Sequence, residues 1–214
     1  MFLICTEYVE GRRKGQAMAL SLSPADARAD AAASHAVFET ALGFFGVIWS
    51  EAGLVRLLLP QASREAVARR MLRLQGVTGD GGARPPWVGR LIAAVSAYAE
   101  GREVEFGEVP LDLAGVDDFC LDIYAATRAL AYGQTTTYGE LARRAGHAGL
   151  ARETGAALGA NPVPLVVPCH RVLAAGGRIG GFSAPGGAAA KERMLALEGV
   201  RLGPPPSAQA SFGF

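Results

Sequence analysis

The segment NPVPLVVPCHR at residues 161–171 constrains the fold of this chain more than any other part of the sequence. Its three prolines fix φ and lack the backbone N–H that a helix interior or a central strand needs. The residues between them are apolar. The sequence therefore predicts an apolar stretch of constrained, irregular backbone that leads directly to Cys169 and His170.

Cys169 and His170 are adjacent, although neighbours in an extended strand point to opposite faces. Both side chains can address one small site only where the chain turns, and the preceding prolines favour such a turn. A free thiol is only roughly a few per cent ionised near pH 7, so a nucleophilic cysteine needs a base or positive surroundings. His170 is a candidate base, and Glu198 is a candidate to hold its imidazole. The alternative is a packed cysteine beside a surface histidine, which this dipeptide alone would favour.

The first half of the chain has the pattern of a small sheet with helices. Aromatic and β-branched residues at 35–60, interrupted by a Glu-Ala-Gly turn, predict a strand meander. Helical spacing follows at 63–75 and 86–99, the second with proline near its start, where a missing N–H costs little. A short strand is predicted at 109–113.

The second half has the pattern of a helical unit. Residues 116–133 predict an amphipathic helix that begins with acidic residues and ends at Gly133. Two shorter helical patterns at 137–145 and 149–159 are separated by a glycine-containing turn, which predicts a helix-turn-helix. A glycine-rich loop at 176–187 then precedes a last helix at 188–199.

Charge is distributed unevenly along the chain. The 214 residues have a net charge of only +1, which favours no particular partner. From residue 128 onward, however, nine basic residues face four acidic ones, whereas residues 100–122 contain eight carboxylates and one arginine. A polyanion would therefore bind the C-terminal half.

The cysteines and the apolar runs indicate the compartment. Cys5, Cys120 and Cys169 are widely separated and follow none of the paired spacings that indicate zinc, so we expect reduced thiols and a cytoplasmic protein. No run of 18 apolar residues occurs, and the N-terminus lacks the pattern of a signal peptide, so no membrane partner is expected. Met18 is a candidate natural start, as a hypothesis.

Five motifs follow one another between residues 135 and 199: TTTYGELA, ARETGAALGANP, NPVPLVVPCHRV, GGFS and KERMLALEG. In this order and spacing they resemble the O6-alkylguanine-DNA alkyltransferases. The resemblance is strong over about residues 116–200, weaker over the preceding unit, and absent from residues 1–34. It implies an α/β fold, with a small N-terminal antiparallel sheet and helices followed by a mostly helical C-terminal domain that carries the helix-turn-helix and an active-site cysteine.

We expect four regions on this basis. Residues 1–34 form a poorly ordered extension, 35–112 the sheet-and-helix domain, 113–204 the DNA-binding alkyltransferase domain, and 205–214 a flexible tail.

The resemblance implies a self-consuming methylated-DNA–protein-cysteine methyltransferase that moves the alkyl group of O6-alkylguanine onto Cys169. His170 would remove the thiol proton through a bound water, and Glu198 would orient and polarise His170. Asn161 would tie the recognition helix to the active-site turn. Because a thioether is not hydrolysed back by water, the protein would be consumed, and neither a cofactor nor a metal is expected.

The same resemblance implies that the helix-turn-helix flips the damaged base out of double-stranded DNA from the minor groove. Tyr138 would crowd the target phosphate, assist base rotation and protonate the departing guanine. Arg152 would enter the stack where the base has left. Ala151 and Gly155 leave part of the helix predicted at 149–159 almost without side chains, which permits its close approach to DNA.

The implied base pocket contains the backbone carbonyls of Cys169 and Val172 and the backbone N–H of Ser183, which would read the guanine edge. Phe182 stands where many family members carry tyrosine; a stacking face remains and a hydroxyl is lost. The loop is lengthened around residues 184–185 relative to the shortest family form, which leaves open how large an alkyl group fits. Activity on O4-alkylthymine is also open. An N-terminal zinc site is not inferred, since no recognisable ligand spacing occurs.

Three other functions compete with repair. A non-enzymatic sensor of alkylated DNA is the main alternative, but such relatives replace the acceptor cysteine, and Cys169 is present. A thiol hydrolase would need an oxyanion hole and would have no use for an adjoining helix-turn-helix. A sequence-specific regulator would carry polar side chains for the major groove, of which residues 149–159 offer few. We expect a monomer whose partner is double-stranded DNA containing O6-alkylguanine.

Overall fold

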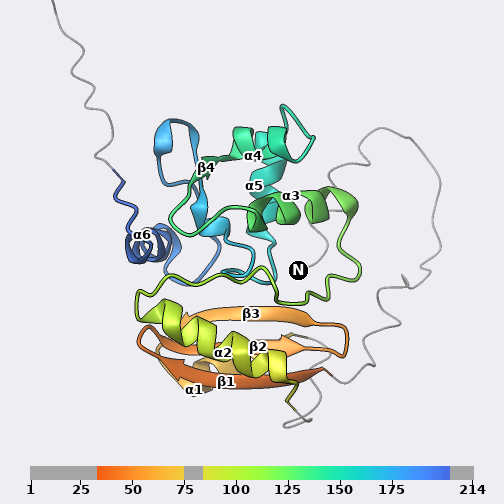
Figure 1. Ribbon diagram of the computed structural model, residues 1–214, viewed down its shortest axis with the longest axis vertical. Coiled ribbons are helices and arrows are strands. Elements are labelled where there is room, and N and C mark those ends of the chain that lie inside the picture. The colour runs from red at the N-terminus through yellow and green to blue at the C-terminus, as the bar shows by residue number, and fades with distance from the viewer. Residues whose placement is uncertain (1–32, 75–83, 203–214) are drawn as a thin grey trace, which may run out of the picture.

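The computed structural model describes residues 33–74 and 84–202 (Figure 1). Of the predicted extension, only the last two residues are described. The predicted tail and Cys5 lie outside the described residues.

A three-stranded antiparallel sheet forms the N-terminal unit, as the strand meander predicts. β1 (Ser34–Thr40), β2 (Gly43–Trp49) and β3 (Leu54–Gln61) lie in the order β1-β2-β3. Helix α1 (Arg64–Leu72) covers one face and helix α2 (Pro86–Ala99) the other (Figure 1). The central strand is therefore buried on both faces, which explains its continuous apolar sequence GFFGVIW.

Strand β2 divides its side chains between two layers because neighbours alternate across a strand. Phe45, Val47 and Trp49 belong to the main core, whereas Ile48 packs in a smaller cluster with residues of α1. At Gly46 an added Cβ would meet the Met71 side chain and would lie 2.7 Å from Cγ1 of Val67, a short and stiff side chain, so this close approach of α1 favours glycine. The aromatic and β-branched pattern predicts the strand, and the packing of the two helices shows which side chains enter which layer.

Helix α1 begins where the sequence predicts and ends earlier. Ser63 caps it, accepting a hydrogen bond from the Ala66 N–H. It ends at Leu72 rather than at residue 75, and Arg73 and Leu74 continue as a turn. Helix α2 matches the predicted range 86–99, with Pro86 in its first turn.

The predicted strand at 109–113 is wrong. Only one isolated bridge forms there, between Leu54 and Leu111, with Leu54 N–H donating to Pro110 O and Asp112 N–H donating to Leu54 O. Pro110 has no N–H to extend the ladder. The segment instead runs along β3 and is held by a 2.6 Å hydrogen bond from Ser50 Oγ to Asp112 Oδ2.

The next helix is shorter than the predicted range 116–133. Helix α3 (Asp118–Arg128) begins after Asp117, whose carboxylate accepts from the Cys120 N–H, and Ala129 is its C-cap. The chain then turns, with Gly133 at φ +69°, a conformation that favours glycine. Gly133 therefore marks this turn, five residues beyond the end of the helix.

The helix-turn-helix prediction is confirmed. Helix α4 (Tyr138–Arg144) and helix α5 (Ala151–Gly159) are separated by a six-residue turn and pack against each other and against α3. The last helix, α6 (Gly187–Leu197), also forms as expected. Between α5 and α6 the chain makes two 3-10 turns, η2 (Cys169–Arg171) and η3 (Ala175–Gly177).

One core joins the sheet unit to the helical unit. A single cluster of buried side chains extends from β2 and α2 to α3, α5 and the proline-rich segment. A backbone hydrogen bond of 3.0 Å from Leu57 N–H in β3 to Pro162 O also connects the two. The predicted fold class, a small antiparallel sheet with helices followed by a mostly helical part, is confirmed. In the described residues, no helix combines the length and apolar character needed to cross a membrane.

Candidate active site

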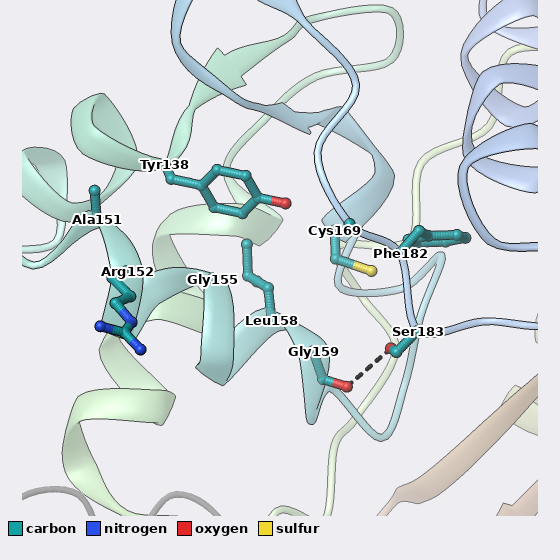
Figure 2. Close-up of a pocket in the computed structure, with 10 residues that line it drawn as sticks. Tyr138, Ala151, Arg152, Gly155, Leu158, Gly159, Cys169, Phe182 and Ser183 are labelled. Carbon is teal, nitrogen blue, oxygen red and sulfur yellow. Dashed lines mark hydrogen bonds between the residues drawn. The ribbon is translucent and has the colours of Figure 1, made fainter.

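A short parallel ladder brings two distant parts of the sequence to one site. β4 (Thr136–Thr137) pairs with β5 (Val172–Leu173), and the sequence patterns predict neither strand. Tyr138 directly follows β4 as the first residue of α4, and the Cys169–Arg171 turn directly precedes β5. The ladder therefore fixes the first helix of the helix-turn-helix beside Cys169 (Figure 2).

The predicted turn at Cys169 is confirmed. Cys169 is the first residue of η2, and its side chain lies at the end of a pocket with 7% of the residue exposed. The preceding segment is irregular, and Leu165 has φ +76°, which is unusual for a residue with a side chain. Backbone constraint and the 3-10 turn together present the sulfur to the pocket while His170 lies behind it, fully buried.

Asn161 holds this irregular segment together. Its Nδ2 donates to Val167 O at 2.9 Å, and its Oδ1 accepts from Val163 N–H at 3.0 Å. A hydrogen bond from Asn161 also reaches the Cys169 side chain and partly opposes the burial that raises the pKa of its thiol. Asn161 therefore connects the end of α5 with the active-site turn.

His170 and Glu198 form a buried pair. His170 Nε2 lies 2.7 Å from Glu198 Oε1, and both side chains are inaccessible to solvent. The other ring nitrogen, Nδ1, is buried and has no hydrogen-bond partner among the described residues. Because the Glu198 carboxylate accepts at Nε2, the Nε2-protonated tautomer leaves Nδ1 free to accept a proton.

Arg171 completes a dense set of donors around Glu198. Its Nε donates to Glu198 Oε2 at 2.8 Å and its Nη2 to Oε1 at 3.0 Å, while its Nη1 donates to Leu130 O. Gly133 N–H also donates to Oε2. Burial alone would raise the pKa of Glu198, but the hydrogen bonds from His170 and Arg171 outweigh it and hold that pKa at about 2. The carboxylate is therefore ionised at neutral pH.

The thiol and the imidazole are both held in their neutral forms. Burial raises the pKa of Cys169, and the Asn161 hydrogen bond, the charge of Lys191 and nearby backbone N–H groups oppose it only in part. Burial also lowers the pKa of His170, in spite of the Glu198 carboxylate. At neutral pH the resting pair is thus a thiol and a neutral imidazole, a donor and an acceptor for one proton.

Lys191 places a positive charge beside this pair. It lies on the buried face of α6 and is fully buried, and its Nζ donates to Val172 O. The same Nζ lies 5.6 Å from the Tyr138 ring centroid and 5.9 Å from that of Phe182. Burial lowers the pKa of Lys191, while the neighbouring Cys169 raises it. The cation is therefore placed to favour the thiolate form of Cys169.

The pocket in front of the sulfur has a volume of about 550 Å³. It extends from Arg152 on α5 to Phe182 and Ser183 in the glycine-rich loop, with Tyr138 on one wall (Figure 2). Its lining residues are Tyr138, Ala151, Arg152, Gly155, Leu158, Gly159, Cys169, Gly181, Phe182 and Ser183. One cavity therefore connects the second helix of the helix-turn-helix with the thiol.

Helix α5 presents three small residues, Leu158 and one arginine to this pocket. Ala151 and Gly155 line its wall, and Arg152 is exposed and makes no hydrogen bond or ion pair within residues 33–74 and 84–202. In contrast, Arg143 and Arg144 on α4 are both bound to Glu140, at 2.7 and 2.9 Å. Arg152 is therefore available to an external partner.

The base-pocket residues predicted from the sequence occupy different places. Phe182 and Ser183 line the cavity, and Ser183 Oγ donates to Gly159 O at 2.9 Å, which ties the loop to the end of α5 (Figure 2). Val172 is fully buried outside the lining, and its carbonyl accepts from Lys191. Because a carbonyl oxygen has two lone pairs, this bond leaves one acceptor position on Val172 O.

His147 contacts two residues of helix α3. Its Nε2 lies 2.9 Å from Asp122 Oδ2, and its ring packs edge-on against Phe119 at 4.8 Å between centroids. These contacts connect the turn of the helix-turn-helix to α3.

Three residues at the site were not singled out from the sequence: Lys191, Arg171 and Tyr98. A signal existed for Lys191, since Lys191, Met194, Leu195 and Glu198 recur at helical spacing on one buried face. Arg171 belongs to the PCHR motif, but nothing in the motif indicates that it binds Glu198. Tyr98 lies in another part of the chain and has no local signal.

Burial lowers the pKa of His170 from its ordinary value of about 6.5, so the protein should lose stability as the pH falls below that value. Since His170 has a lower pKa in the folded state, the unfolded chain takes up the proton first, and stability present above that pH is lost below it. Glu198 adds a second contribution to stability, which is fully present above about pH 4.5 and is lost as the pH falls through about 2. Urea unfolding between pH 8 and 5 should show this slope, and His170→Gln should reduce it. Equal slopes in both proteins would contradict the assignment.

Comparison with known proteins identifies the same part of the chain. Residues 118–200 match the family described as 6-O-methylguanine DNA methyltransferase, DNA binding domain. A methylated-DNA–protein-cysteine methyltransferase of Methanothermobacter thermautotrophicus is 33% identical over 159 residues, covering 73% of this chain and 80% of that protein. A DNA base-flipping protein of Thermus thermophilus is 42% identical over 111 residues, covering 52% of this chain and 73% of that protein.

A solved structure extends the likeness to the sheet unit. The crystal structure of Mycobacterium tuberculosis OGT in complex with DNA has a TM-score of 0.60 and 32% sequence identity, covering 77% of this chain and 92% of that chain. The likeness thus covers both the sheet unit and the helical unit with the buried thiol. The chain belongs to the methylated-DNA–protein-cysteine methyltransferase family.

Proposed function

We propose that this protein repairs DNA by moving an alkyl group from O6 of guanine to Sγ of Cys169, once per molecule. One observation carries the proposal: a single pocket joins an exposed arginine on the second helix of a helix-turn-helix to a cysteine backed by a buried His–Glu pair. A DNA-binding helix and a nucleophile that share one cavity have a common use when the substrate is a base.

The base must leave the duplex before it can react. Inside the stack, O6 of guanine is hidden from any thiol, and extrusion costs a few kcal/mol. Arg152 is the long side chain at the start of α5 and has no partner among the described residues, and Ala151 and Gly155 permit the helix to approach the groove closely. We propose that helix α5 approaches DNA from the minor groove and that the Arg152 side chain fills the gap that the flipped base leaves in the stack.

The chemical step begins with a proton transfer. Cys169 gives its proton to His170, and the unpartnered Nδ1 is the atom placed to receive it, through one water. Glu198 stabilises the imidazolium that forms, while Asn161 and Lys191 stabilise the thiolate.

Alkyl transfer then forms a bond between Sγ of Cys169 and the alkyl carbon, and the bond between that carbon and O6 breaks. The electron pair returns to the guanine, which takes up a proton. Burial raises the pKa of Tyr138, so its hydroxyl is protonated at neutral pH and can supply that proton; the proton that His170 took from Cys169 then returns through solvent to the Tyr138 hydroxyl. The product is a thioether, which water does not hydrolyse, so the protein acts once and the reaction requires no cofactor.

The flipped guanine would stack against Phe182 and be read by backbone groups. The Ser183 N–H and the carbonyls of Cys169 and Val172 are the groups assigned to its edge. Ser183 is held by its bond to Gly159 O, which fixes the loop that carries both Phe182 and the N–H group.

Lys191→Met should shift the pH dependence of Cys169 upward. Methionine retains the length of the side chain but removes the charge that favours the thiolate, so the midpoint should rise by about one pH unit. The measurement is the rate of Cys169 alkylation by iodoacetamide against pH, with the modified peptide identified by mass spectrometry. An unchanged midpoint would show that the charge of Lys191 does not favour the Cys169 thiolate.

The partner we propose is duplex DNA containing O6-alkylguanine, bound by a monomer in the cytoplasm. Residues 35–112 and 113–204 are the proposed domains, with the DNA-binding surface on the second.

The affinity for DNA should weaken as the salt concentration rises and show little dependence on DNA sequence, because contacts with phosphate dominate non-specific binding. The buried cysteines Cys120 and Cys169 suit a reducing compartment.

The direct test follows the lesion. A duplex with one O6-methylguanine is incubated with excess protein, digested and analysed for guanine and O6-methylguanine. The proposed activity converts the lesion to guanine in the intact strand. The alternative, a sensor of alkylated DNA, would bind the duplex and leave the methyl group in place; that outcome would contradict the proposal.

A further inference from the structure

Tyr98 brings a hydroxyl from the sheet unit into the active site. It is the tyrosine near the end of α2, on the face that buries Val88, Leu91 and Val95, and it is 1% exposed. Its OH lies 3.2 Å from Glu198 Oε1, 3.4 Å from Met194 O and 3.5 Å from His170 Nε2. A hydroxyl has one proton to donate, and the ionised carboxylate is both the nearest and the strongest acceptor.

We propose that Tyr98 is a positioning residue, which acts through Glu198 to set how strongly the His170–Glu198 pair attracts the Cys169 proton. The inference rests on the proposed function of that pair. Tyr98 and His170 donate to the same carboxylate oxygen, Oε1, together with Nη2 of Arg171. The sheet unit thereby takes part in the proton transfer that the helical unit carries out.

The sign of this effect follows from the shared oxygen. When His170 is neutral, the charge on Glu198 is fully available to the Tyr98 hydroxyl; when His170 is protonated, the imidazolium partly neutralises that charge. The Tyr98 bond therefore stabilises the neutral form of His170 more than the protonated form. Removal of the hydroxyl should raise the pKa of His170 and make proton transfer from Cys169 easier.

Tyr98→Phe removes one hydroxyl and none of the other charged or titratable groups around the pair. Arg171 and Lys191 contribute positive charge, Arg171 by direct hydrogen bonds and Lys191 through space. Cys169 lies on the same 3-10 turn as His170, Arg171 lies over the Tyr132 ring, and the charge of Glu103 acts on Tyr132. Because Tyr98→Phe keeps the ring and leaves these groups in the chain, it tests the contribution of the hydroxyl.

Tyr132 offers a matched control. Its ring packs edge-on against Tyr98 with centroids 6.3 Å apart, and its hydroxyl donates to a backbone carbonyl, Leu197 O, at 2.8 Å. Tyr132→Phe therefore removes a hydroxyl from the same region without removing a bond to Glu198. A loss of packing or stability alone would affect both variants alike.

The test compares the full-length protein with Tyr98→Phe and Tyr132→Phe. The rate of Cys169 alkylation by iodoacetamide is followed against pH by mass spectrometry of the Cys169 peptide. In Tyr98→Phe the midpoint should move to lower pH by about half a unit, while Tyr132→Phe keeps the midpoint of the unmodified protein. The ring resonances of His170, assigned among only three histidines, should titrate at higher pH in Tyr98→Phe.

An unchanged midpoint in Tyr98→Phe, an upward shift, or an equal shift in Tyr132→Phe would overturn the inference. The readout uses a small reagent and no DNA. Failure of methyl transfer would therefore count against the proposed function, whereas failure of the pH shift would count against Tyr98.

Discussion

Cys169→Ser should abolish methyl transfer and leave DNA binding unchanged. The substitution removes the one thiol that lines the pocket among the described residues, and a serine hydroxyl is far less acidic and less polarisable than a thiol. Helix α5 and Arg152 do not contact the sulfur through any hydrogen bond, so the DNA-binding surface keeps its shape. Transfer is followed as loss of O6-methylguanine from a duplex, and binding by titration of the same duplex.

Cys120→Ser is the matched control for this substitution. Cys120 is a buried cysteine on α3, 1% exposed and outside the pocket lining. Its replacement should leave transfer intact, apart from any loss of stability. Continued transfer by Cys169→Ser, or loss of transfer in a folded Cys120→Ser protein, would show that the acceptor has been misplaced.

Arg152→Ala should reduce repair of duplex DNA by on the order of 100-fold, since the flipped base loses the side chain that fills its place and extrusion costs a few kcal/mol. Reaction of Cys169 with a free O6-alkylguanine base that fits the pocket should stay nearly unchanged, because no duplex has to be opened. The measurement is the ratio of the two single-turnover rates.

Arg90→Ala controls for the loss of one positive charge. Arg90 is an exposed arginine on α2, away from the pocket, and its removal should change the rate on duplex DNA very little. If Arg152→Ala slowed the two substrates equally, Arg152 would act on the thiol chemistry or on folding, and its role in base flipping would be wrong.

Local patterns predict most of the fold. The three strands, helix α2, the helix-turn-helix and the last helix follow from apolar spacing, from proline and glycine, and from capping residues. The strand predicted at 109–113 from its apolar alternation does not form, because the segment makes no continuous ladder of backbone hydrogen bonds. Pro110 has no N–H to donate, and only Leu111 forms a bridge with β3. The two-residue strands β4 and β5 have no pattern of their own, since they form only when segments 36 residues apart meet.

The site is predictable in part, for the same reason. Cys169, His170 and Glu198 are suggested by their chemistry and by the family resemblance, and the structure places His170 against Glu198. Tyr98 could not be found in this way, because a tyrosine on the buried face of α2 is indistinguishable from an ordinary core residue until the helix is packed on α6. Long-range contacts, rather than local propensity, decide which polar groups share the site.

The most direct test of the central claim is the mass of the protein after reaction. Incubated with an excess of duplex DNA that carries O6-methylguanine, the protein should gain one methyl group per molecule, on the peptide containing Cys169, and restore an equal amount of guanine before the reaction stops. An unchanged mass, a methyl group on Cys5 or Cys120, or guanine restored well beyond one equivalent would contradict the account.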